Sequence, residues 1–174
     1  LCIGENRPHK NYNRVLEAYS KGYLECGEGF PDLFIAGNNV DDLKDQVIKF
    51  GIEKKVSLLG LVPNSKILWL YKNAYALLYV SLYEGFGLPL LEAMSSELPV
   101  ITTNMHSTKE ISGGAALLVN PESVNEISKA LVEIFQNESL RKEYIKKGLE
   151  RERFFSWPKA ANQTIDIYNE VNLI

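Results

Sequence analysis

The chain lacks the features that mark several classes of protein. Its 174 residues contain only two cysteines and two histidines, which are not spaced as a metal-ligand set or a disulfide framework, so a reducing cytoplasm is the expected location. No apolar run approaches the roughly 18 residues of a membrane span. Basic residues do not outnumber acidic ones, and the net charge is −3. This balance argues against nucleic acid and leaves a small molecule as the expected partner.

Short apolar runs alternate with longer stretches of helical periodicity. The runs expected as strands are residues 1–3, 33–36, 56–59, 76–80, 100–102 and 116–119. Four helices are expected between these runs: after Asn11, near 41–50, after Pro63 and from near Leu88. After residue 120, helices are expected over 123–136, 138–153 and 157–171. Strands that are apolar on both faces indicate a parallel sheet covered on two sides by right-handed crossovers. The predicted fold class is therefore α/β: a doubly wound, Rossmann-like parallel sheet of about six strands with helices on both faces.

Two further expectations concern the ends of the chain. Leu1 begins inside an apolar run, so we expect these residues to be a fragment of a longer protein. The last predicted helix carries Trp157, Ile165 and Tyr168 along one side. That apolar side predicts a contact either with this sheet or with a domain outside these residues. Trp69, Trp157 and the nine tyrosines are expected to be packing residues.

Ligands of open parallel sheets bind at the carboxyl ends of the strands, which directs attention to two loops. "GENRPHKN" (4–11) follows the first predicted strand, and "SLYEGFGLP" (81–89) follows the fourth. A dinucleotide fingerprint is excluded, because it requires G-x-G-x-x-G after the first strand. Here Gly85 and Gly87 follow the fourth strand, and Leu90 occupies the third small position.

The second loop has the composition of an anion site. Gly85 and Gly87 can adopt backbone angles closed to other residues and let a ligand approach the main chain. Pro89 suits the first turn of a helix that starts near Leu88. The amides of Phe86, Gly87 and Leu88, here called the anion cradle, would then face outward at the positive end of the helix dipole. The alternative is a glycine-rich turn that only joins strand to helix.

Two glutamates flank this cradle. Because carboxylates repel phosphate but accept hydrogen bonds from vicinal hydroxyls, Glu84 and Glu92 indicate a ligand with sugar rings on both sides of its phosphates. A nucleoside diphosphate sugar has this form. Spacing alone is weak evidence, since Glu17 and Glu25 show the same separation on an ordinary helix.

In the first loop, Lys10 and Arg7 would place positive charge opposite the cradle. Such charge would neutralise a diphosphate leaving group as its bond to the sugar breaks. The alternative is a solvated turn in which Asn11 caps the following helix.

"SLYEGFGLPLLEAMSSELPVITTN" resembles the signature segment of family 4 of the retaining glycosyltransferases, with its E-x7-E motif. "GENRPHKN", "VSLLGLVPNSKILWLYKNA", "STKEISGGAALLVNP" and "FFSW" resemble segments that occur there in the same order. The resemblance covers nearly the whole chain. It implies a GT-B fold with two Rossmann-like halves, of which residues 1–174 would be the C-terminal, donor-binding domain. The N-terminal acceptor domain would be absent from this chain.

The resemblance also implies roles for individual residues. Glu84 would contact hydroxyls of the donor sugar, Lys10 the diphosphate and Glu92 the ribose, and the first two are the expected catalytic residues. Main-chain contacts with the donor are implied for Gly85, Phe86, Gly87, Leu88, Leu61 and Val62, the last two near the base. The donor would be GDP- or UDP-linked, and no metal or other cofactor is implied.

The first loop departs from the family pattern. Many relatives have arginine where this chain has Glu5 and His9. Arg7 is a candidate substitute in the phosphate clamp, although its position is not the family's.

The expected function is retaining transfer of a hexosyl group in cell-envelope glycan biosynthesis, to an acceptor glycan or lipid-linked sugar. The missing domain would hold the acceptor and would also bring the protein to the inner face of the membrane. We expect little or no transfer by this chain alone. Two alternatives stay open: a sugar-nucleotide epimerase of similar architecture, which would need no acceptor, and a non-catalytic nucleotide-binding module.

Overall fold

The structure, a computed structural model, describes residues 1–171. Its strands are parallel and form two three-stranded sheets, ordered β1-β2-β3 and β4-β5-β6. Their bounds are β1 Cys2–Ile3, β2 Leu33–Ala36, β3 Val56–Gly60, β4 Leu77–Tyr79, β5 Val100–Thr103 and β6 Leu117–Val119. Each lies within one residue of its predicted run, and the predicted α/β class is confirmed.

The two sheets adjoin at β1 and β4. The Leu1 nitrogen donates to the Ala76 carbonyl at 2.9 Å, and the Leu78 amide donates to the Leu1 carbonyl at 2.8 Å. Across the domain the strand order is therefore β3-β2-β1-β4-β5-β6. In this order the chain reverses its direction of winding between β1 and β4, where open α/β sheets bind ligands.

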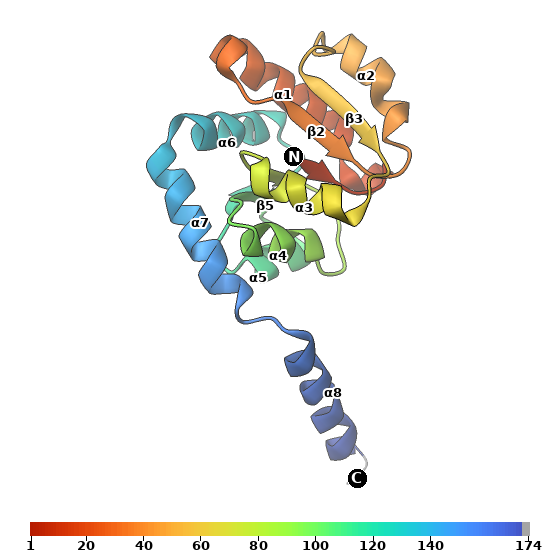
Figure 1. The fold of residues 1–174 in the computed structure, drawn as a ribbon, viewed down its shortest axis with the longest axis vertical. Helices are drawn as coiled ribbons and strands as arrows, with labels where there is room; N and C mark the ends of the chain where they lie inside the picture. Colours follow the sequence, from red (N-terminus) through yellow and green to blue (C-terminus); the bar gives the residue numbers. More distant parts are fainter. Residues whose placement is uncertain (172–174) are drawn as a thin grey trace.

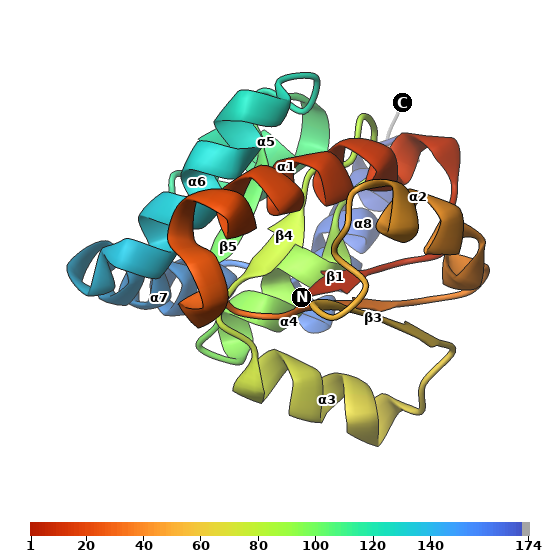
Figure 2. The ribbon, with the colours of Figure 1, turned by 90° about the horizontal axis from the view of Figure 1, so that it is seen from above.

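Helices cover both faces of the sheet (Figure 2). α1 (Tyr12–Cys26) and α6 (Val124–Gln136) pack on one face, and α3 (Asn64–Asn73) and α4 (Leu88–Ser95) on the other. The shorter helices are η1 Pro8–Lys10, η2 Gly27–Gly29, η3 Val40–Leu43, α2 Lys44–Lys49 and α5 His106–Ser112. Two separate apolar clusters, one on each side of the sheet, form the core.

The C-terminal helices differ in their packing. α7 (Glu138–Glu152) packs along α4 and α6, whereas α8 (Trp157–Val171) projects away from the body (Figure 1). No side chain of α8 is buried, and Trp157 is 78% exposed. Of the two expectations for this helix, a contact with the sheet is therefore wrong. Within residues 1–171 no helix is both long and apolar enough to cross a membrane.

The N-terminus of α1 corrects one prediction. Asn11 occupies the N-cap position, but its side chain makes no capping hydrogen bond. Its Nδ2 instead donates to the Val80 carbonyl at 3.1 Å and to the Pro121 carbonyl at 2.7 Å, while its Oδ1 accepts from Arg14 at 3.0 Å. Asn11 thus joins the loops that follow β1, β4 and β6.

Candidate functional site

The structure brings together the two loops that the sequence analysis selected. The Leu82 amide donates to the His9 carbonyl at 2.7 Å, beside the link from Asn11 to the Val80 carbonyl. Lys10 Nζ donates to Glu84 Oε1 at 2.6 Å. Backbone, amide and charged contacts therefore fix the loop after β1 against the loop after β4, at the reversal point of the sheet.

The ion pair of Lys10 and Glu84 is largely shielded from solvent, with side-chain exposures of 14% and 13%. Lys10 Nζ also donates to the Tyr79 hydroxyl at 2.9 Å. Burial raises the pKa of Glu84, but Lys10 and the nearby hydroxyls of Ser81 and Tyr79 outweigh burial, so the pKa lies below its ordinary value. Glu84 is therefore an anion at neutral pH.

Gly4, which follows β1, provides the space that Lys10 occupies. Its φ is +142°, and a Cβ there would lie 3.0 Å from Lys10 Cε. Gly37, which follows β2, lies against the same segment: a Cβ on Gly37 would be 2.0 Å from the Gly4 carbonyl oxygen. The Lys10 side chain thus lies against Gly4, and Gly37 lets the backbone of the loop after β2 approach Gly4 closely.

The second loop forms the expected helix start. α4 begins at Leu88, and Gly87 is its N-cap with φ +102°. Within residues 1–171 the amides of Phe86, Gly87 and Leu88 have no hydrogen-bond acceptor. The amides of the anion cradle are thus unpaired within the described chain, with Phe86 and Leu88 exposed and Gly87 buried. Ser107 of α5 supports the loop by donating to the Glu84 carbonyl at 2.6 Å.

The expectation for Gly85 is partly wrong. Gly87 has the positive φ that favours glycine, but Gly85 does not. The Cβ position of Gly85 faces open space. Its backbone is therefore accessible, although its conformation does not require glycine.

Glu92 lies on the solvent-exposed side of α4, in its second turn. Its Oε2 accepts a hydrogen bond from the Tyr71 hydroxyl at 2.7 Å. Tyr71 belongs to α3 and is only 1% exposed. Sequence reasoning treated the tyrosines as packing residues and missed this contact, because no local pattern pairs residues on two different helices.

The remaining predicted residues lie apart from the ion pair. Arg7 Nε contacts Glu5 Oε2 at 2.7 Å, and the Arg7 side chain is 60% exposed. Leu61 and Val62 lie in the loop between β3 and α3, where Leu61 is 78% exposed and Val62 is half-buried. Arg7 thus pairs with a neighbouring acid rather than with Glu84.

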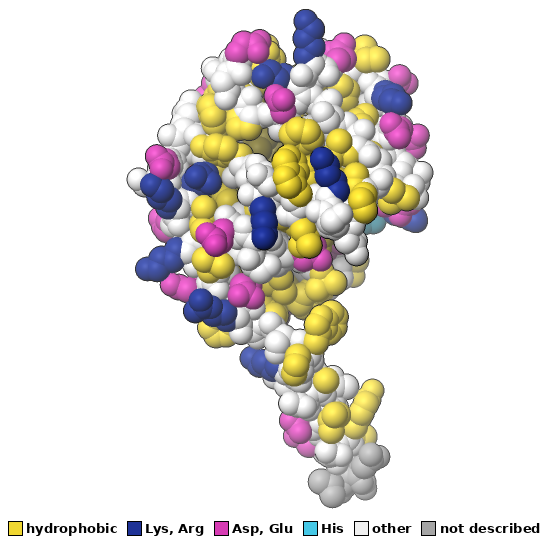
Figure 3. All heavy atoms as spheres, in the orientation of Figure 1, with side chains coloured by type: hydrophobic (Ala, Val, Ile, Leu, Met, Phe, Trp, Pro, Cys, Tyr) yellow, Lys and Arg dark blue, Asp and Glu magenta, His cyan; other side chains and the backbone are white. Residues whose placement is uncertain are grey.

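A groove of about 800 Å³ runs between α4 on one side and, on the other, the segment after α7 together with the first turns of α8. Phe86, Leu88 and Glu92 line one side of it, and Phe155 and Trp157 the other. Figure 3 shows hydrophobic side chains along α8 and at its junction with the body. One end of the predicted donor site thus continues into an apolar surface.

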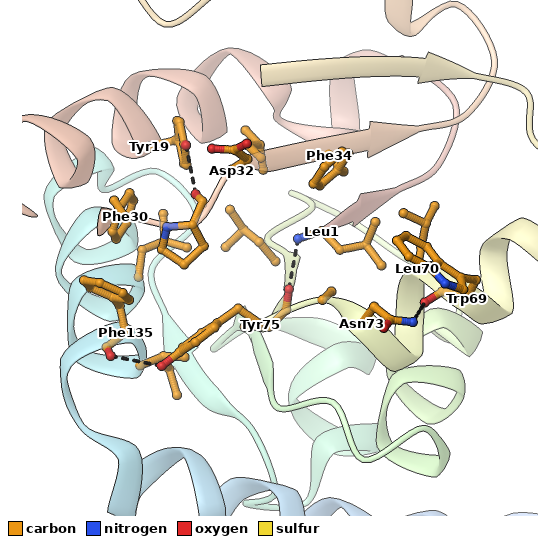
Figure 4. Close-up of a pocket in the computed structure, with 17 residues that line it drawn as sticks. Leu1, Tyr19, Phe30, Asp32, Phe34, Trp69, Leu70, Asn73, Tyr75 and Phe135 are labelled. Atoms are coloured by element: carbon orange, nitrogen blue, oxygen red, sulfur yellow. Dashed lines mark hydrogen bonds between the residues drawn. The ribbon is translucent and has the colours of Figure 1, made fainter. Parts of the chain in front are cut away.

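A second cavity, of about 350 Å³, lies at the amino ends of β1, β2 and β4 (Figure 4). Its walls are mainly apolar and aromatic, with Tyr19, Phe30 and Tyr75 among them. Asp32, its one acid, pairs with Lys55 at 3.3 Å. In the part of the chain that the structure describes, no lysine or arginine lines this cavity, and it lies at the edge of the sheet opposite the two loops. Among the described residues no cluster of His, Cys, Asp and Glu could hold a metal ion.

Two relatives are similar to this chain in sequence. The O-antigen chain mannosyltransferase B of Escherichia coli is 37% identical over 171 residues, covering 97% of this chain and 45% of the relative. The O-antigen chain mannosyltransferase RfbU of Salmonella typhimurium is 31% identical over 138 residues, covering 78% of this chain and 38% of the relative. The chain therefore spans less than half the length of these two relatives.

Solved structures of glycosyltransferases share the fold. WaaG, described as a glycosyltransferase involved in lipopolysaccharide biosynthesis, matches with a TM-score of 0.80 at 19% identity, over 95% of this chain and 46% of that one. The C-terminal domain of LpcC, a glycosyl transferase group 1 family protein from Francisella tularensis, matches with a TM-score of 0.75 at 25% identity, over 86% and 82%. These likenesses agree with the predicted α/β fold of GT-B glycosyltransferases. The family described as glycosyl transferases group 1 matches residues 1–151, and the chain therefore belongs to this family of GT-B-type glycosyltransferases.

Proposed function

We propose that residues 1–174 are the donor-binding domain of a family 4 glycosyltransferase, which transfers a hexosyl group from a nucleoside diphosphate sugar with retention of configuration. The observation that carries this proposal is the Lys10–Glu84 ion pair beside the unpaired amides of the anion cradle. A cation and free amides suit a diphosphate, and an adjacent carboxylate suits sugar hydroxyls. All of them lie where the sheet reverses its winding.

The diphosphate would be held by the anion cradle and by Lys10. As the bond between the anomeric carbon and the phosphate oxygen breaks, negative charge grows on the leaving diphosphate. Donors that are already oriented stabilise that charge without reorganising. Lys10 is oriented in this way, because Tyr79, Glu84 and the space beside Gly4 fix its side chain.

The two carboxylates would hold the polyols on either side. Glu84 is charged at neutral pH and can accept hydrogen bonds from hydroxyls of the donor sugar while Lys10 offsets its charge. Glu92 is exposed four residues after the first residue of α4, Leu88, and would accept hydrogen bonds from the ribose. A charge-assisted bond is roughly twice as strong as a neutral one, so each acid adds affinity as well as orientation.

The named relatives narrow the choice of sugar. Both are mannosyltransferases of O-antigen chains, so mannose is the first sugar to test, with GDP and UDP as the nucleotides. The acceptor, a glycan or a lipid-linked sugar, would bind to the N-terminal domain, which the length of the relatives leaves room for. The same domain would bring the cytoplasmic protein to the inner face of the membrane. No metal or other cofactor enters the proposal.

Nucleotide binding tests the proposal directly. Thermal unfolding of the chain is measured with GDP, UDP and ADP in turn. A ligand at 100 times its Kd should stabilise the fold by about 2.7 kcal/mol, which raises the Tm by roughly 5–10 °C for a domain of this size. Lys10→Met should weaken diphosphates more than nucleosides. Absence of any shift with all three nucleotides would refute the donor-binding role.

Product analysis of the full-length protein tests the reaction. Incubation with GDP-mannose and an acceptor, followed by NMR of the product, should show the anomeric configuration of the donor retained. An inverted product, or conversion of the donor sugar without an acceptor, would contradict the proposal.

A further inference from the structure

The hydrogen bond between Tyr71 and Glu92 joins a buried residue to an exposed one. Tyr71 is 1% exposed and belongs to the apolar cluster under α3 and α4. Its hydroxyl reaches Glu92 Oε2 at 2.7 Å. Within residues 1–171 no hydrogen bond is made to Glu92 Oε1. One carboxylate oxygen is thus anchored to the core, and the other is available to a ligand.

Burial raises the pKa of Tyr71, and the hydrogen bond and negative charge of Glu92 raise it further. The phenol therefore remains protonated and can only donate to the carboxylate. A glutamate on an exposed helical turn otherwise samples several rotamers, and fixing them on binding costs conformational entropy. The Tyr71 hydroxyl, a fixed hydrogen-bond donor, restricts the Glu92 rotamers and so removes most of that entropic cost before the ligand binds.

We propose that Tyr71 is a positioning residue that orients Glu92 toward the ribose and so gives the domain its preference for ribonucleotides over deoxyribonucleotides. This inference rests on the proposed function, in which Glu92 binds the ribose. Tyr71 itself does not touch the donor, because its ring is enclosed by the core and its hydroxyl is occupied by Glu92.

A second buried tyrosine provides a contrast within the same site. The Tyr79 hydroxyl, at the end of β4, accepts from Lys10 at 2.9 Å, and Tyr79 is 4% exposed. Tyr71 thus supports the predicted ribose contact, and Tyr79 supports the predicted diphosphate contact. The two hydroxyls should therefore have separable effects on different parts of the same ligand.

The experiment compares three Tyr→Phe variants, each of which removes only a hydroxyl. Calorimetry measures the Kd of whichever of GDP or UDP binds, and of its 2′,3′-dideoxy counterpart. Tyr71→Phe should weaken the ribonucleotide about ten-fold and leave the dideoxynucleotide unchanged. Tyr79→Phe should weaken both alike. Tyr19→Phe is the matched control, because this buried hydroxyl donates to the Pro31 carbonyl at 2.9 Å, at the opposite edge of the sheet.

A double-mutant cycle tests the route through Glu92. In a Glu92→Ala background, Tyr71→Phe should cause no further loss of ribonucleotide affinity, because the residue that it positions is gone. Denaturation midpoints of all variants show whether each one folds. Tyr19→Phe should lower stability without altering either Kd.

The outcomes distinguish failure of the proposed donor binding from failure of the positioning role of Tyr71. If the unmodified chain binds no nucleotide, the proposed function fails and the inference fails with it. If it binds ribo- and dideoxynucleotides equally, the ribose role of Glu92 is wrong and Tyr71 has no selectivity to confer. If it discriminates and Tyr71→Phe discriminates as strongly, or loses both ligands alike, the positioning role of Tyr71 alone is overturned.

Discussion

Replacing Lys10 with methionine tests the physical account of the site without any ligand. The substitution keeps most of the side-chain volume but removes the charge that faces Glu84. Both side chains are less than 15% exposed, so Glu84 becomes a shielded carboxylate without its cation. Removing one partner of a buried pair costs roughly 3–5 kcal/mol. We expect about 3 kcal/mol, at the lower end of that range, because the Tyr79 hydroxyl can turn to donate to Glu84.

The loss of stability in Lys10→Met should depend on pH, and the ionisation of Glu84 determines whether it grows or shrinks as the pH falls. In the unmodified chain the pKa of Glu84 is lowered from its ordinary 4.5, so the ion pair contributes stability above that value and loses it as the pH falls. Without Lys10, burial raises the pKa instead, and the charged carboxylate destabilises the fold at neutral pH. Protonation relieves this penalty. The difference between variant and unmodified chain should therefore shrink as the pH is lowered from 7.5 to 4.

Urea denaturation at both pH values measures this difference. Lys10→Met should lower the free energy of unfolding by about 3 kcal/mol at pH 7.5 and by clearly less at pH 4. The double variant Lys10→Met, Glu84→Gln should recover most of the stability, since no buried charge remains. An equal loss at both pH values, or a double variant as unstable as the single one, would show that the charge of Lys10 does not stabilise the carboxylate of Glu84.

Three further predictions concern contacts of the fold around the site. Gly37→Ala should destabilise the fold by about 4 kcal/mol in urea denaturation, because a Cβ there would clash with the Gly4 carbonyl oxygen. Gly60→Ala, at φ +64° in open space, should cost only about 1 kcal/mol. Similar costs for the two variants would contradict the close approach of the loops after β1 and β2. Arg151→Ala should cost about 2 kcal/mol, because its guanidinium donates to two carbonyls near the end of α5, while exposed Arg153→Ala should be neutral in the same assay. Ending the chain before residue 157 should change the free energy of unfolding by less than about 0.5 kcal/mol, and a larger loss would mean that α8 packs on the body.

The sequence predicted the strands and most helices because each has a local signature. Apolar runs mark the strands, and Gly87 with Pro89 marks the start of α4. The short helix α5 was missed, since its seven residues carry no apolar periodicity and begin at His106, whose φ is +53°. Local patterns specify backbone conformation over a few residues, and α5 is too short and irregular to show one.

The site was predicted less completely than the fold. The sequence selected Lys10 and Glu84 as members of one site, but not as partners of each other, because they lie 74 residues apart. The contact of Tyr71 with Glu92 depends on how α3 and α4 pack, and the amide of Asn11 was assigned to a helix cap. Interactions between distant segments have no local signature, and these three depend entirely on the tertiary arrangement.

The Asn11 side chain links some, but not all, of the loops at the edge of the sheet where the donor is proposed to bind. Both Nδ2 hydrogens and the Oδ1 of this buried amide are engaged, so the loops behind β1, β4 and β6 cannot change length or register independently. The loop behind β3, with Leu61 exposed, does not share that constraint. Among related sequences, insertions and substitutions that change nucleotide specificity should therefore occur mainly in the loop behind β3. The loops behind β1, β4 and β6 should change together or stay unchanged.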